Sequence, residues 1–464
     1  MIALPTYSGR KVAVLGLARS GSAAVRALTA AGAEVVAWDD SEARRDAHAK
    51  DGVRLANLGA YNFEDVDALI LSPGIPYTHP APHPAVTAAQ TAGVGVMGDV
   101  ELFATASLEA KIVGITGTNG KSTTTALIGH LLSAAGRQVQ VGGNIGRPVL
   151  DLDPLGADGV YVVELSSYQI DLAPSLVCDV AVLTNISADH LDRHGDMAGY
   201  VAVKRRIFNG QADAQAAVVG VDDPYSRETR DWLLAQGHAH VVPIAVGNAL
   251  GEGVYVADGV LHDRMSEVER LVDLKGVRSL RGAHNWQNAA AAYAAARVLG
   301  LEAAGIEVAL QAFPGLPHRM ESVAFVEGVE FVNDSKATNA DAAARALSSF
   351  ADIFWIAGGR AKEGGYAPLD PYLGNVRRAY LIGEAAEAMT AALAGRIETS
   401  MAGDLESAMS AAFLDAKLVA KSGRHPVILL SPACASFDQF NDYEHRGETF
   451  RALAQGRASK RGAA

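Results

Sequence analysis

The sequence predicts an α/β protein of three domains, each built on a parallel sheet. An apolar strand, a glycine-containing or polar loop and an amphipathic helix follow one another repeatedly, which is typical of parallel α/β sheets. This order begins anew at Lys11, at Lys111 and near Val329. A chain of 464 residues is also too long for one ordinary core, so two or three domains are expected.

The first domain begins with a predicted strand at Lys11–Leu15, followed by a glycine-containing loop at Gly16–Gly21 and an amphipathic helix. The next predicted strand is Glu34–Trp38. A second loop, Ser72-Pro-Gly74, follows the predicted strand Asp67–Leu71. Because the carboxyl ends of parallel strands share one edge, both loops are expected at the ligand-binding edge of this sheet.

The first of these loops nearly matches the glycine fingerprint of dinucleotide-binding domains. It lies between a strand and a helix, and Asp39 and Asp40 follow about twenty residues later. The middle glycine of that fingerprint, which lets the backbone approach a pyrophosphate, is Ala18 here. The added methyl group narrows the approach and weakens the interpretation as a nicotinamide site.

The second domain carries the loop Gly114-Ile-Thr-Gly-Thr-Asn-Gly-Lys-Ser122 between a predicted strand and a predicted helix at Ser122–Ala135. Glycines let backbone N–H groups turn toward one anion, and the helix N-terminus adds partial positive charge. Lys121 can reach the β- and γ-phosphates of a nucleotide, and the Ser122 hydroxyl can ligate Mg²⁺. The sequence therefore predicts a central sheet of the P-loop ATPase type.

This loop differs from the standard phosphate loop because Ile115 occupies the first glycine position and Gly117 supplies the flexibility instead. The alternative interpretation is a glycine-rich turn with a chance Lys-Ser pair. The strand and the helix on either side of the loop favour the phosphate-binding interpretation.

Polar side chains follow the next two predicted strands of the central sheet. Glu164 ends the strand Gly159–Glu164, and Asp189-His190 follows the strand Val177–Asn185. Taken alone, Glu164 would be a solvent-facing residue at a strand end, and His190 would be structural. Placed beside Ser122 at the carboxyl edge, the Glu164 carboxylate is an oxygen ligand of the kind Mg²⁺ prefers, and Asp189 and His190 form a second polar pair at the same edge.

The third domain is predicted from four apolar strands, Val329–Asn333, Ile353–Ala357, Ala379–Ile382 and Val427–Leu430. Candidate hinges are the glycine-containing segment Gly93–Asp99 and the proline-framed segment Phe313–Pro317. We therefore expect domains at 1–98, 99–315 and 316–464, with the first and the last Rossmann-like. A small hairpin with its turn at Asp258-Gly259 is expected in the middle domain.

Composition excludes several classes of protein. The formal net charge of −12 argues against DNA or RNA as a main partner. Cys178 and Cys434 are too few for a disulfide framework or a thiolate metal site. Neither a signal peptide nor an apolar run of about 20 residues is found, so a cytoplasmic protein without membrane insertion is expected. We expect a monomer.

The ordered motifs resemble those of the Mur ligase family, which builds the peptide stem of bacterial peptidoglycan. The resemblance covers essentially the whole chain and is closest to the D-glutamate-adding member. The motifs that carry it are Gly98-Asp-Val-Glu-Leu-Phe103, Gly114–Ser122, Glu164-Leu-Ser-Ser-Tyr-Gln169, Asn185 through Asp192, Gly282-Ala-His-Asn285 through Asn288, Leu316-Pro-His-Arg-Met-Glu321, Asn333-Asp-Ser-Lys-Ala-Thr-Asn339 and Leu430-Ser-Pro-Ala-Cys-Ala-Ser-Phe-Asp-Gln439.

The resemblance implies an ATP-dependent ligase that forms an amide bond through an acyl phosphate. The substrates it implies are UDP-N-acetylmuramoyl-L-alanine and D-glutamate, in cytoplasmic peptidoglycan precursor synthesis. It implies ATP contacts from Gly117, Thr118, Asn119, Gly120, Lys121, Ser122, Thr123, Asn285, Asn288, His318, Arg319, Asp334 and Lys336. It implies UDP-sugar contacts from Gly16, Leu17, Ala18, Asp39, Asp40, Ser72 and Asn144, and D-glutamate contacts from Thr338, Lys362, Ser436 and Tyr443.

The resemblance also implies the catalytic group Lys121, Glu164, His190 and Lys204, with two Mg²⁺ ions. Ser122 and Glu164 would ligate one ion and His190 the other. Lys204 would react with CO₂ to form a carbamate that ligates or orients the second ion. Taken alone, Lys204 would be an ordinary lysine on an exposed helix face.

Three classes of protein could explain parts of this sequence. A nicotinamide dehydrogenase would explain only the first loop, and a P-loop switch or motor NTPase would leave the motifs after residue 333 unexplained. An acyl-phosphate ligase accounts for all three domains. Within that class, the alternatives are a sister Mur ligase that adds another amino acid and a folylpolyglutamate synthetase.

Overall fold

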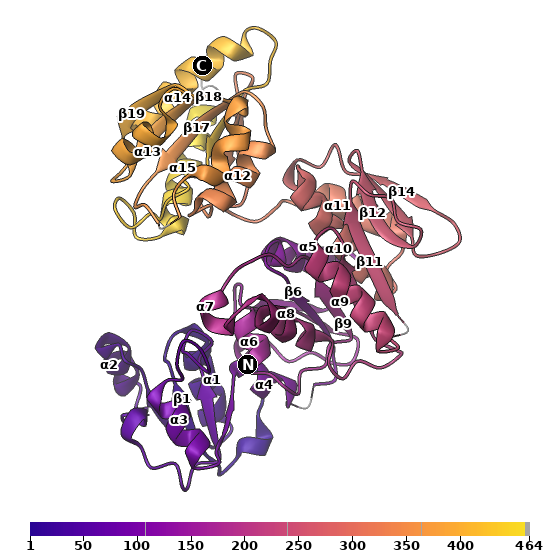
Figure 1. The fold of residues 1–464 in the computed structure, drawn as a ribbon, viewed down its shortest axis with the longest axis vertical. Coiled ribbons are helices and arrows are strands. Elements are labelled where there is room, and N and C mark those ends of the chain that lie inside the picture. The colour runs from indigo at the N-terminus through magenta and orange to yellow at the C-terminus, as the bar shows by residue number, and fades with distance from the viewer. Residues whose placement is uncertain (107, 239, 363, 460–464) are drawn as a thin grey trace. The chain divides into compact units, whose positions relative to one another are not determined.

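The protein folds around three β-sheets (Figure 1). The computed structural model describes residues 1–106, 108–238, 240–362 and 364–459. The chain divides into two compact units, Met1–Leu274 with Asn285–Gln311, and Lys275–His284 with Ala312–Ala464. The first unit holds two of the sheets and the second unit holds the third. Figure 1 colours them from indigo through magenta to yellow along the chain.

The first sheet has five parallel strands in the order β3-β2-β1-β4-β5 within the described residues. Its strands are β1 Lys11–Leu15, β2 Glu34–Trp38, β3 Arg54–Leu55, β4 Ala68–Leu71 and β5 Gly95–Met97. Its helices are α1 Arg19–Ala30, α2 Glu42–Lys50, α3 Pro84–Thr91 and α4 Asp99–Ala104. The predicted strands Lys11–Leu15 and Glu34–Trp38 are confirmed.

The central sheet has nine strands in the order β14-β13-β12-β11-β10-β9-β6-β8-β7 within the described residues. They are β6 Lys111–Thr116, β7 Val139–Gly143, β8 Val160–Glu164, β9 Val180–Leu183, β10 Ala216–Gly220, β11 Val241–Val246, β12 Gly253–Ala257, β13 Val260–Arg264 and β14 Arg270–Asp273. All pairs from β7 to β12 are parallel, and the last two pairs are antiparallel. The predicted hairpin is therefore confirmed, with Asp258 and Gly259 both at positive φ in its turn.

The helices of the central region are α5 Lys121–Ala134, α6 Ser167–Asp171, α7 Leu191–His194, α8 Met197–Arg205, α9 Pro224–Ala235, α10 Ala283–Val298 and α11 Ala303–Ala312.

The third sheet contains β15 Glu321–Val326, β16 Val329–Asn333, β17 Ile353–Gly358, β18 Val376–Ile382, β19 Thr399–Gly403 and β20 Val427–Leu430. Within the described residues its order is β15-β16-β20-β17-β18-β19, and only the pair β15-β16 is antiparallel. Its helices are α12 Ala340–Ser348, α13 Ala386–Leu393, α14 Leu405–Ala420 and α15 Tyr443–Ser459.

Burial on both faces explains the continuous apolar runs of the central strands. Every residue of β8, β9 and β10 is buried, and parallel strands covered on both faces need no polar alternation. One apolar cluster joins Val14 of the first sheet to Phe103 and Tyr161, whose rings pack edge to face at 5.2 Å. The first two sheets therefore share part of their core inside the first unit.

The two expected hinge segments lie in different surroundings. Gly93–Asp99 contains β5 and is fixed inside the first unit, where the N–H of Gly98 donates to the carbonyl of Leu172 at 2.9 Å. Phe313–Pro317 lies directly after the boundary of the second unit at Ala312. Among the described residues, no helix has both the length and the apolar character that crossing a bilayer requires.

Candidate active site

The predicted phosphate loop connects β6 to α5, and two of its glycines are required by its geometry. Gly117 and Gly120 have φ values of +150° and +84°, which side-chain-bearing residues rarely adopt. A Cβ atom on Gly117 would lie 2.0 Å from Oγ1 of Thr184, and one on Gly120 would lie 2.1 Å from Oδ1 of Asn288. The loop is thus packed between β9 and α10.

Side chains from the end of β9 hold the loop at Asn119. The N–H of Asn119 donates to Oδ1 of Asn185 at 2.9 Å, and its carbonyl accepts from Oγ1 of Thr184 at 2.7 Å. Nδ2 of Asn185 also donates to Oε1 of Gln287 at 2.7 Å, and Nε2 of Gln287 donates to Asp222 at 2.8 Å. This chain of hydrogen bonds ties the loop to α10 and to the end of β10. The sequence analysis missed Gln287 and Asp222, because neither belongs to a pattern with a known spacing.

Two lysines donate to the carbonyl groups of the same loop. Nζ of Lys121 lies 3.0 Å from the carbonyl oxygen of Gly117 and 2.9 Å from that of Thr118. Nζ of Lys204 lies 2.8 Å from the carbonyl oxygen of Gly117 and 3.3 Å from Oγ1 of Thr116. The interpretation of Lys204 as an exposed lysine is therefore wrong, since its exposed fraction is 1%. Helix α8 turns this residue inward beneath the loop.

Burial and a neighbouring charge both destabilise the ammonium form of Lys204. Burial is the larger cause, and the positive charge of Lys121 adds to it, so the pKa of Lys204 lies well below its ordinary value. The carboxylate of Asp189 acts in the opposite direction. An amine in this position is more readily uncharged, and hence nucleophilic, than a surface lysine.

Glu164 ends β8 inside the protein and not at its surface. Its exposed fraction is 2%, which contradicts the interpretation as a solvent-facing residue. Nδ2 of Asn144 donates to Oε1 of Glu164 at 2.7 Å, whereas Oε2 is buried and accepts no hydrogen bond from the described residues. Ser122, also buried, lies in the first turn of α5. A buried carboxylate oxygen without a donor fits the oxygen preference of Mg²⁺.

His190 lies at the start of α7, next to an aromatic stack. Its φ is +53°, and its Nε2 lies 3.3 Å from the carboxylate of Asp189. Its ring packs 4.9 Å from that of Tyr168, which packs 5.6 Å from His194. Burial is the main cause that lowers the pKa of His190, and the charges of two lysines also lower it. A neutral imidazole is the form that can ligate a metal ion.

The expected metal ligands do not form a conventional cluster. Among the described residues, no group of three or more His, Cys, Asp or Glu side chains is placed to share an ion. Of the expected donors, only Glu164 and His190 belong to these residue types, because the others are the Ser122 hydroxyl and the modified Lys204. The unpaired Glu164 oxygen remains the structural feature that fits a bound cation.

Helix α10 presents Asn285 and Asn288 toward the phosphate loop. Both side chains are buried, and Nδ2 of Asn288 donates to Oδ1 of Asn285 at 3.1 Å. Oγ1 of Thr124, on α5, donates to Oδ1 of Asn288 at 3.2 Å. The two asparagines, predicted to contact ATP, are thus already fixed against the helix that follows the loop.

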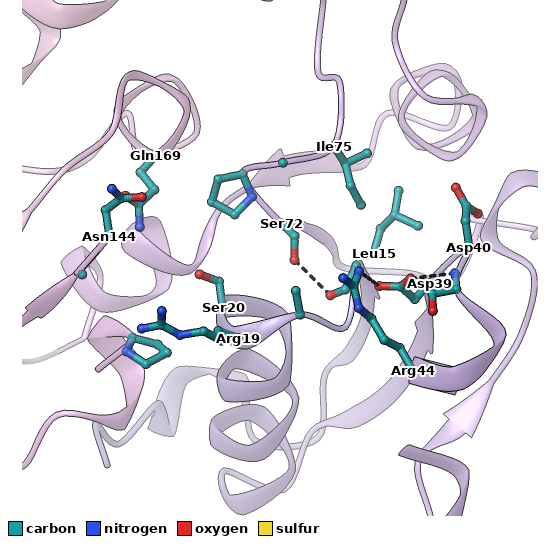
Figure 2. Close-up of a pocket in the computed structure, with 17 residues that line it drawn as sticks. Leu15, Arg19, Ser20, Asp39, Asp40, Arg44, Ser72, Ile75, Asn144 and Gln169 are labelled. Carbon is teal, nitrogen blue, oxygen red and sulfur yellow. Dashed lines mark hydrogen bonds and ion pairs between the residues drawn. The ribbon is translucent and has the colours of Figure 1, made fainter. Parts of the chain in front are cut away.

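A cavity of about 640 Å³ opens at the carboxyl edge of the first sheet (Figure 2). It is lined by six of the seven residues predicted for the UDP-sugar, namely Gly16, Ala18, Asp39, Asp40, Ser72 and Asn144. Leu17 is buried and does not line it. Figure 2 shows Asn144 and Gln169 on one side of the cavity and Asp39, Asp40 and Arg44 on the other. The sequence analysis did not single out Arg19, Arg44 or Gln169 for this site.

The Asp39 carboxylate fixes the loop after β1 through hydrogen bonds. Its carboxylate accepts the N–H of Leu17 at 2.7 Å and the N–H of Ser41 at 2.8 Å, and Nη1 of Arg44 lies 3.3 Å away. Burial alone would raise the pKa of Asp39, but these three donors outweigh it and lower the pKa. Asp39 is therefore an anion whose oxygens are already engaged.

In the second unit, the residues predicted for ATP surround the end of β16. Nδ2 of Asn333 lies 3.0 Å from Nδ1 of His318, and the N–H of Lys336 donates to the carbonyl of His318 at 3.1 Å. Asp334 accepts from Ser431 at 2.8 Å. Burial raises the pKa of Asp334 to about 7, although this hydrogen bond lowers it. Arg319 belongs to the same unit, in the segment that follows His318.

The structure also brings together residues predicted for D-glutamate. Nζ of Lys362 donates to Oγ1 of Thr338 at 3.3 Å, and the ammonium of Lys336 lies 5.0 Å from the centre of the Tyr443 ring. Ser436 is buried after β20. These residues follow the carboxyl ends of β16, β17 and β20, the edge where ligands bind in open α/β sheets.

The sequence analysis missed a buried arginine that supports this edge. Arg446, on α15, has an exposed fraction of 1%. Its guanidinium donates to the carbonyl of Ser335 at 2.9 Å and to that of Cys434 at 3.2 Å. It thus ties the loop after β16 to the loop after β20. Burial lowers its pKa to about 10.

Known proteins resemble this chain along its whole length. The Mur ligase middle domain matches residues 115–296, and the Mur ligase glutamate ligase domain matches residues 318–434. UDP-N-acetylmuramoylalanine–D-glutamate ligase from Caulobacter vibrioides is 52% identical over 463 residues, covering 98% of each chain. The protein of that name from Phenylobacterium zucineum is 51% identical over 462 residues, again covering 98% of each chain.

A solved structure shares the fold at much lower identity. The MurF ligase from Thermotoga maritima, determined in complex with ADP, aligns with a TM-score of 0.56 at 18% identity. The alignment covers 98% of this chain and 96% of that one. Such a likeness supports the α/β architecture with parallel sheets.

Proposed function

The chain belongs to the Mur ligase family, and from that premise we propose that it joins D-glutamate to UDP-N-acetylmuramoyl-L-alanine with the hydrolysis of ATP to ADP and phosphate. The observation that carries this proposal is the identity of 52% along 98% of the chain to a D-glutamate ligase. The resemblance of the D-glutamate motifs after residue 333 supports the same choice of amino acid.

The proposed reaction has two steps. The alanine carboxylate attacks the γ-phosphorus of ATP, which gives an acyl phosphate and ADP. The uncharged amine of D-glutamate then attacks the acyl carbon, and the C–O bond to phosphate breaks as the amide bond forms. One proton is released for each amide bond. Phosphoryl transfer depends mainly on positioning and on positive charge around the transferred group.

We assign that positive charge to Lys121. Its ammonium lies against the carbonyl groups of Gly117 and Thr118, at the position where the loop would receive phosphates. Thr118, Asn119, Gly120, Ser122 and Thr123 would surround them, and the backbone fixed through Asn119 keeps the N–H groups in place before ATP arrives. We keep for Asn285, Asn288, His318, Arg319, Asp334 and Lys336 the contacts with ATP that the family resemblance implies.

We propose that Mg²⁺ binds with Glu164 and Ser122, and that a second ion uses His190. When bound, Mg²⁺ supplies charge neutralisation to the phosphates. The unpaired buried oxygen of Glu164 supports this assignment. The hydrogen bond from Asn144 holds the other oxygen of the same carboxylate, so its orientation is fixed in advance.

We also propose that Lys204 carries a carbamate formed from CO₂. Its uncharged amine would attack CO₂, and loss of one proton leaves an anionic carbamate. Its burial and the adjacent Lys121 disfavour the ammonium, and the positive charge of Lys121 favours an anion at this position. Carbamate oxygens are ligands of the kind Mg²⁺ prefers.

Each of the three sheets would then bind a different substrate. The first sheet, over 1–98, would hold the UDP-sugar in the cavity lined by Asp39 and Ser72. Residues 99–315 would hold ATP, and residues 316–464 would hold D-glutamate through Thr338, Lys362, Ser436 and Tyr443. We propose Rossmann-like nucleotide-binding roles for the terminal domains, and action as a cytoplasmic monomer.

The test is phosphate release from ATP in the presence of UDP-N-acetylmuramoyl-L-alanine. D-Glutamate should support release and yield a product heavier than the acceptor by one glutamate residue. L-Glutamate, L-lysine and L-alanine should not. Faster turnover with one of those three would contradict the proposed amino acid, and release independent of both substrates would contradict a ligase altogether.

A further inference from the structure

A second large cavity, of about 640 Å³, opens at the opposite edge of the third sheet from the proposed D-glutamate residues. Its walls include Glu330 near the start of β16, Asp352 just before β17 and Val427 at the start of β20. Thr338, Lys362 and Ser436 follow the other ends of these strands. The cavity is therefore separate from the site described above.

Positive charge gathers around this cavity although the chain as a whole is acidic, with a net charge of −12. The cavity is lined by Arg278, Arg281, Arg424 and His425, with Glu330 and Asp352 as its acids. A smaller cavity of about 310 Å³ shares Asp352 and Arg424 with it and adds Arg377. Four arginines thus face two carboxylates.

The two carboxylates are already paired, and they fix the guanidinium groups in place. Nε of Arg377 and Nε of Arg424 each lie 2.8 Å from a different oxygen of Asp352, whose side chain is 10% exposed. Nη1 of Arg281 lies 3.1 Å from Glu330. A guanidinium bound at Nε keeps its terminal nitrogens as donors. One carboxylate therefore orients two cations without using all of their hydrogen bonds.

Arg278 adds a further cation to the cavity, and no carboxylate of a described residue pairs with it. It lies in the short turn Arg278–Leu280 ahead of α10 and makes no ion pair or hydrogen bond with any described residue. The N–H groups of one guanidinium can donate two parallel hydrogen bonds to the oxygens of a phosphate group. Several arginines together favour a multiply charged oxyanion.

Two phenylalanines give the same cavity an apolar side. The Phe325 side chain is 56% exposed, so one side of its ring is open to a ligand. Phe350 also lines the cavity, and the guanidinium of Arg281 lies 5.1 Å above the centre of its ring. Aromatic faces of this kind stack on planar rings. The volume falls in the range of about 300–1,000 Å³ that is usual for small-ligand sites.

We propose that this cavity binds a nucleoside phosphate, with the phosphate at Arg278 and Arg424 and the base against Phe325 and Phe350. The site is distinct from the proposed ATP site and does not depend on the proposed ligase reaction. A ligand held there would join the segment before α10 to the loop before β20, because Arg278 comes from the first and Arg424 from the second.

The test uses the full-length protein with its histidine rings labelled with ¹³C for NMR. His425 lines the cavity and reports binding locally, and its signal is assigned by its loss in His425→Gln. Guanosine 5′-monophosphate should shift the His425 signal along a saturating curve. Arg278→Gln combined with Arg424→Gln should raise the Kd from that curve at least about tenfold, since each charge-assisted hydrogen bond contributes about 1.5–3 kcal/mol.

Arg396→Gln is the matched control, because Arg396 pairs with Asp370 and does not line the cavity. It should leave the Kd unchanged. An equal Kd in the double variant and the control would overturn the site. Binding of inorganic phosphate as tight as that of the nucleotide would overturn the role of the two rings, and equally tight binding of guanosine would overturn the role of the arginines.

Discussion

The loops after β1 and β6 share one plan but have different ionisable groups buried beneath them. Each joins a central parallel strand to a helix, and each begins with a close glycine turn. Under the first loop lies the carboxylate of Asp39, and under the second lies the amine of Lys204, both buried. The buried group, rather than the glycine pattern, therefore distinguishes the ligands that the two loops are suited to bind.

The contacts of the two buried groups explain the distinction. Asp39 accepts a backbone N–H of its loop, at Leu17, and so consumes a donor that could otherwise bind an anion. Lys204 donates to a backbone carbonyl of its loop, at Gly117, and leaves the N–H groups to other partners. The first loop therefore has one N–H fewer for an anion, and an anion bound there depends on its remaining N–H groups and on the N-terminus of α1.

The largest effect is expected for Lys204→Ala. Removal of the proposed carbamate should lower kcat by at least about a thousandfold, the upper end for loss of one preorganised electrostatic group. Added acetate should restore part of the activity by supplying a carboxylate to the emptied space. Lys204→Arg should not respond to acetate, because guanidinium keeps its charge and fills that space. An active Lys204→Ala enzyme in CO₂-free buffer would contradict the proposed modification.

Lys121→Ala should lower kcat by at least about a hundredfold, because one positive charge at the transferred phosphoryl group is lost. Acetate should have no effect on this variant, so the response to acetate distinguishes the role of Lys121 from that of Lys204. Steady-state kinetics with and without acetate provide the measurement. More than half of the wild-type activity in Lys121→Ala would rule out the assignment of this loop to ATP.

A smaller effect is expected for Gln287→Leu, which breaks the chain of hydrogen bonds behind the ATP loop. Asn185 loses its acceptor and Asp222 loses a donor. Two hydrogen bonds of about 0.5–1.5 kcal/mol each correspond to a rise of roughly tenfold in KM for ATP. The KM for the UDP-sugar should not change. Gln236→Leu, at the exposed end of α9, is the control. A rise confined to the UDP-sugar KM would show that this chain does not hold the ATP loop.

Asp39→Asn tests whether the negative charge of Asp39 supports the loop after β1. The loss of charge weakens the hydrogen bonds at Leu17 and Ser41 by about 1 kcal/mol, or roughly fivefold in KM for the UDP-sugar. Because the folded state lowers the pKa of Asp39, this residue stabilises the wild type above the unfolded-state pKa of about 4, and the stabilisation is lost as pH falls through the lowered value. Urea unfolding of both proteins at pH 7 and pH 3 should show a larger difference at the higher pH. An equal difference at both would mean that charge is not the cause.

Local patterns were enough to predict the three sheets and the strands β1, β2, β16 and β20 with their bounds. The predicted strand Val177–Asn185 was too long, because only Val180–Leu183 pairs with its neighbours. Burial could not be predicted for single polar residues. Lys204 and Glu164 look exposed by residue type, and only the packing of α8 and β8 shows that they are not.

Residues that act through other residues were missed for a related reason. Arg446, Gln287 and Asp222 each contact loops that lie far away in the sequence, and a single sequence carries no signal for such contacts. The charge-rich cavity at the start of β16, β17 and β20 is another example. Its arginines come from three separated segments, so their grouping is a property of the fold alone.

The smallest effect is expected for Ala18→Gly, which restores the middle glycine of the dinucleotide fingerprint. Ala18 has an ordinary extended backbone at the N-cap of α1, with φ −75° and ψ −167°, so glycine relieves no strain there. Glycine is preferred over alanine at an N-cap, but it costs more backbone entropy, so the free energy of unfolding should change by less than about 1 kcal/mol. NADH should still bind weakly at most, because the Asp39 carboxylate already accepts from Leu17, Ser41 and Arg44 and has little capacity left for the two hydroxyl groups of a ribose. Fluorescence titration with NADH measures this directly. Saturable binding by the variant would mean that the methyl group of Ala18, and not the engaged carboxylate, keeps dinucleotides from the first loop.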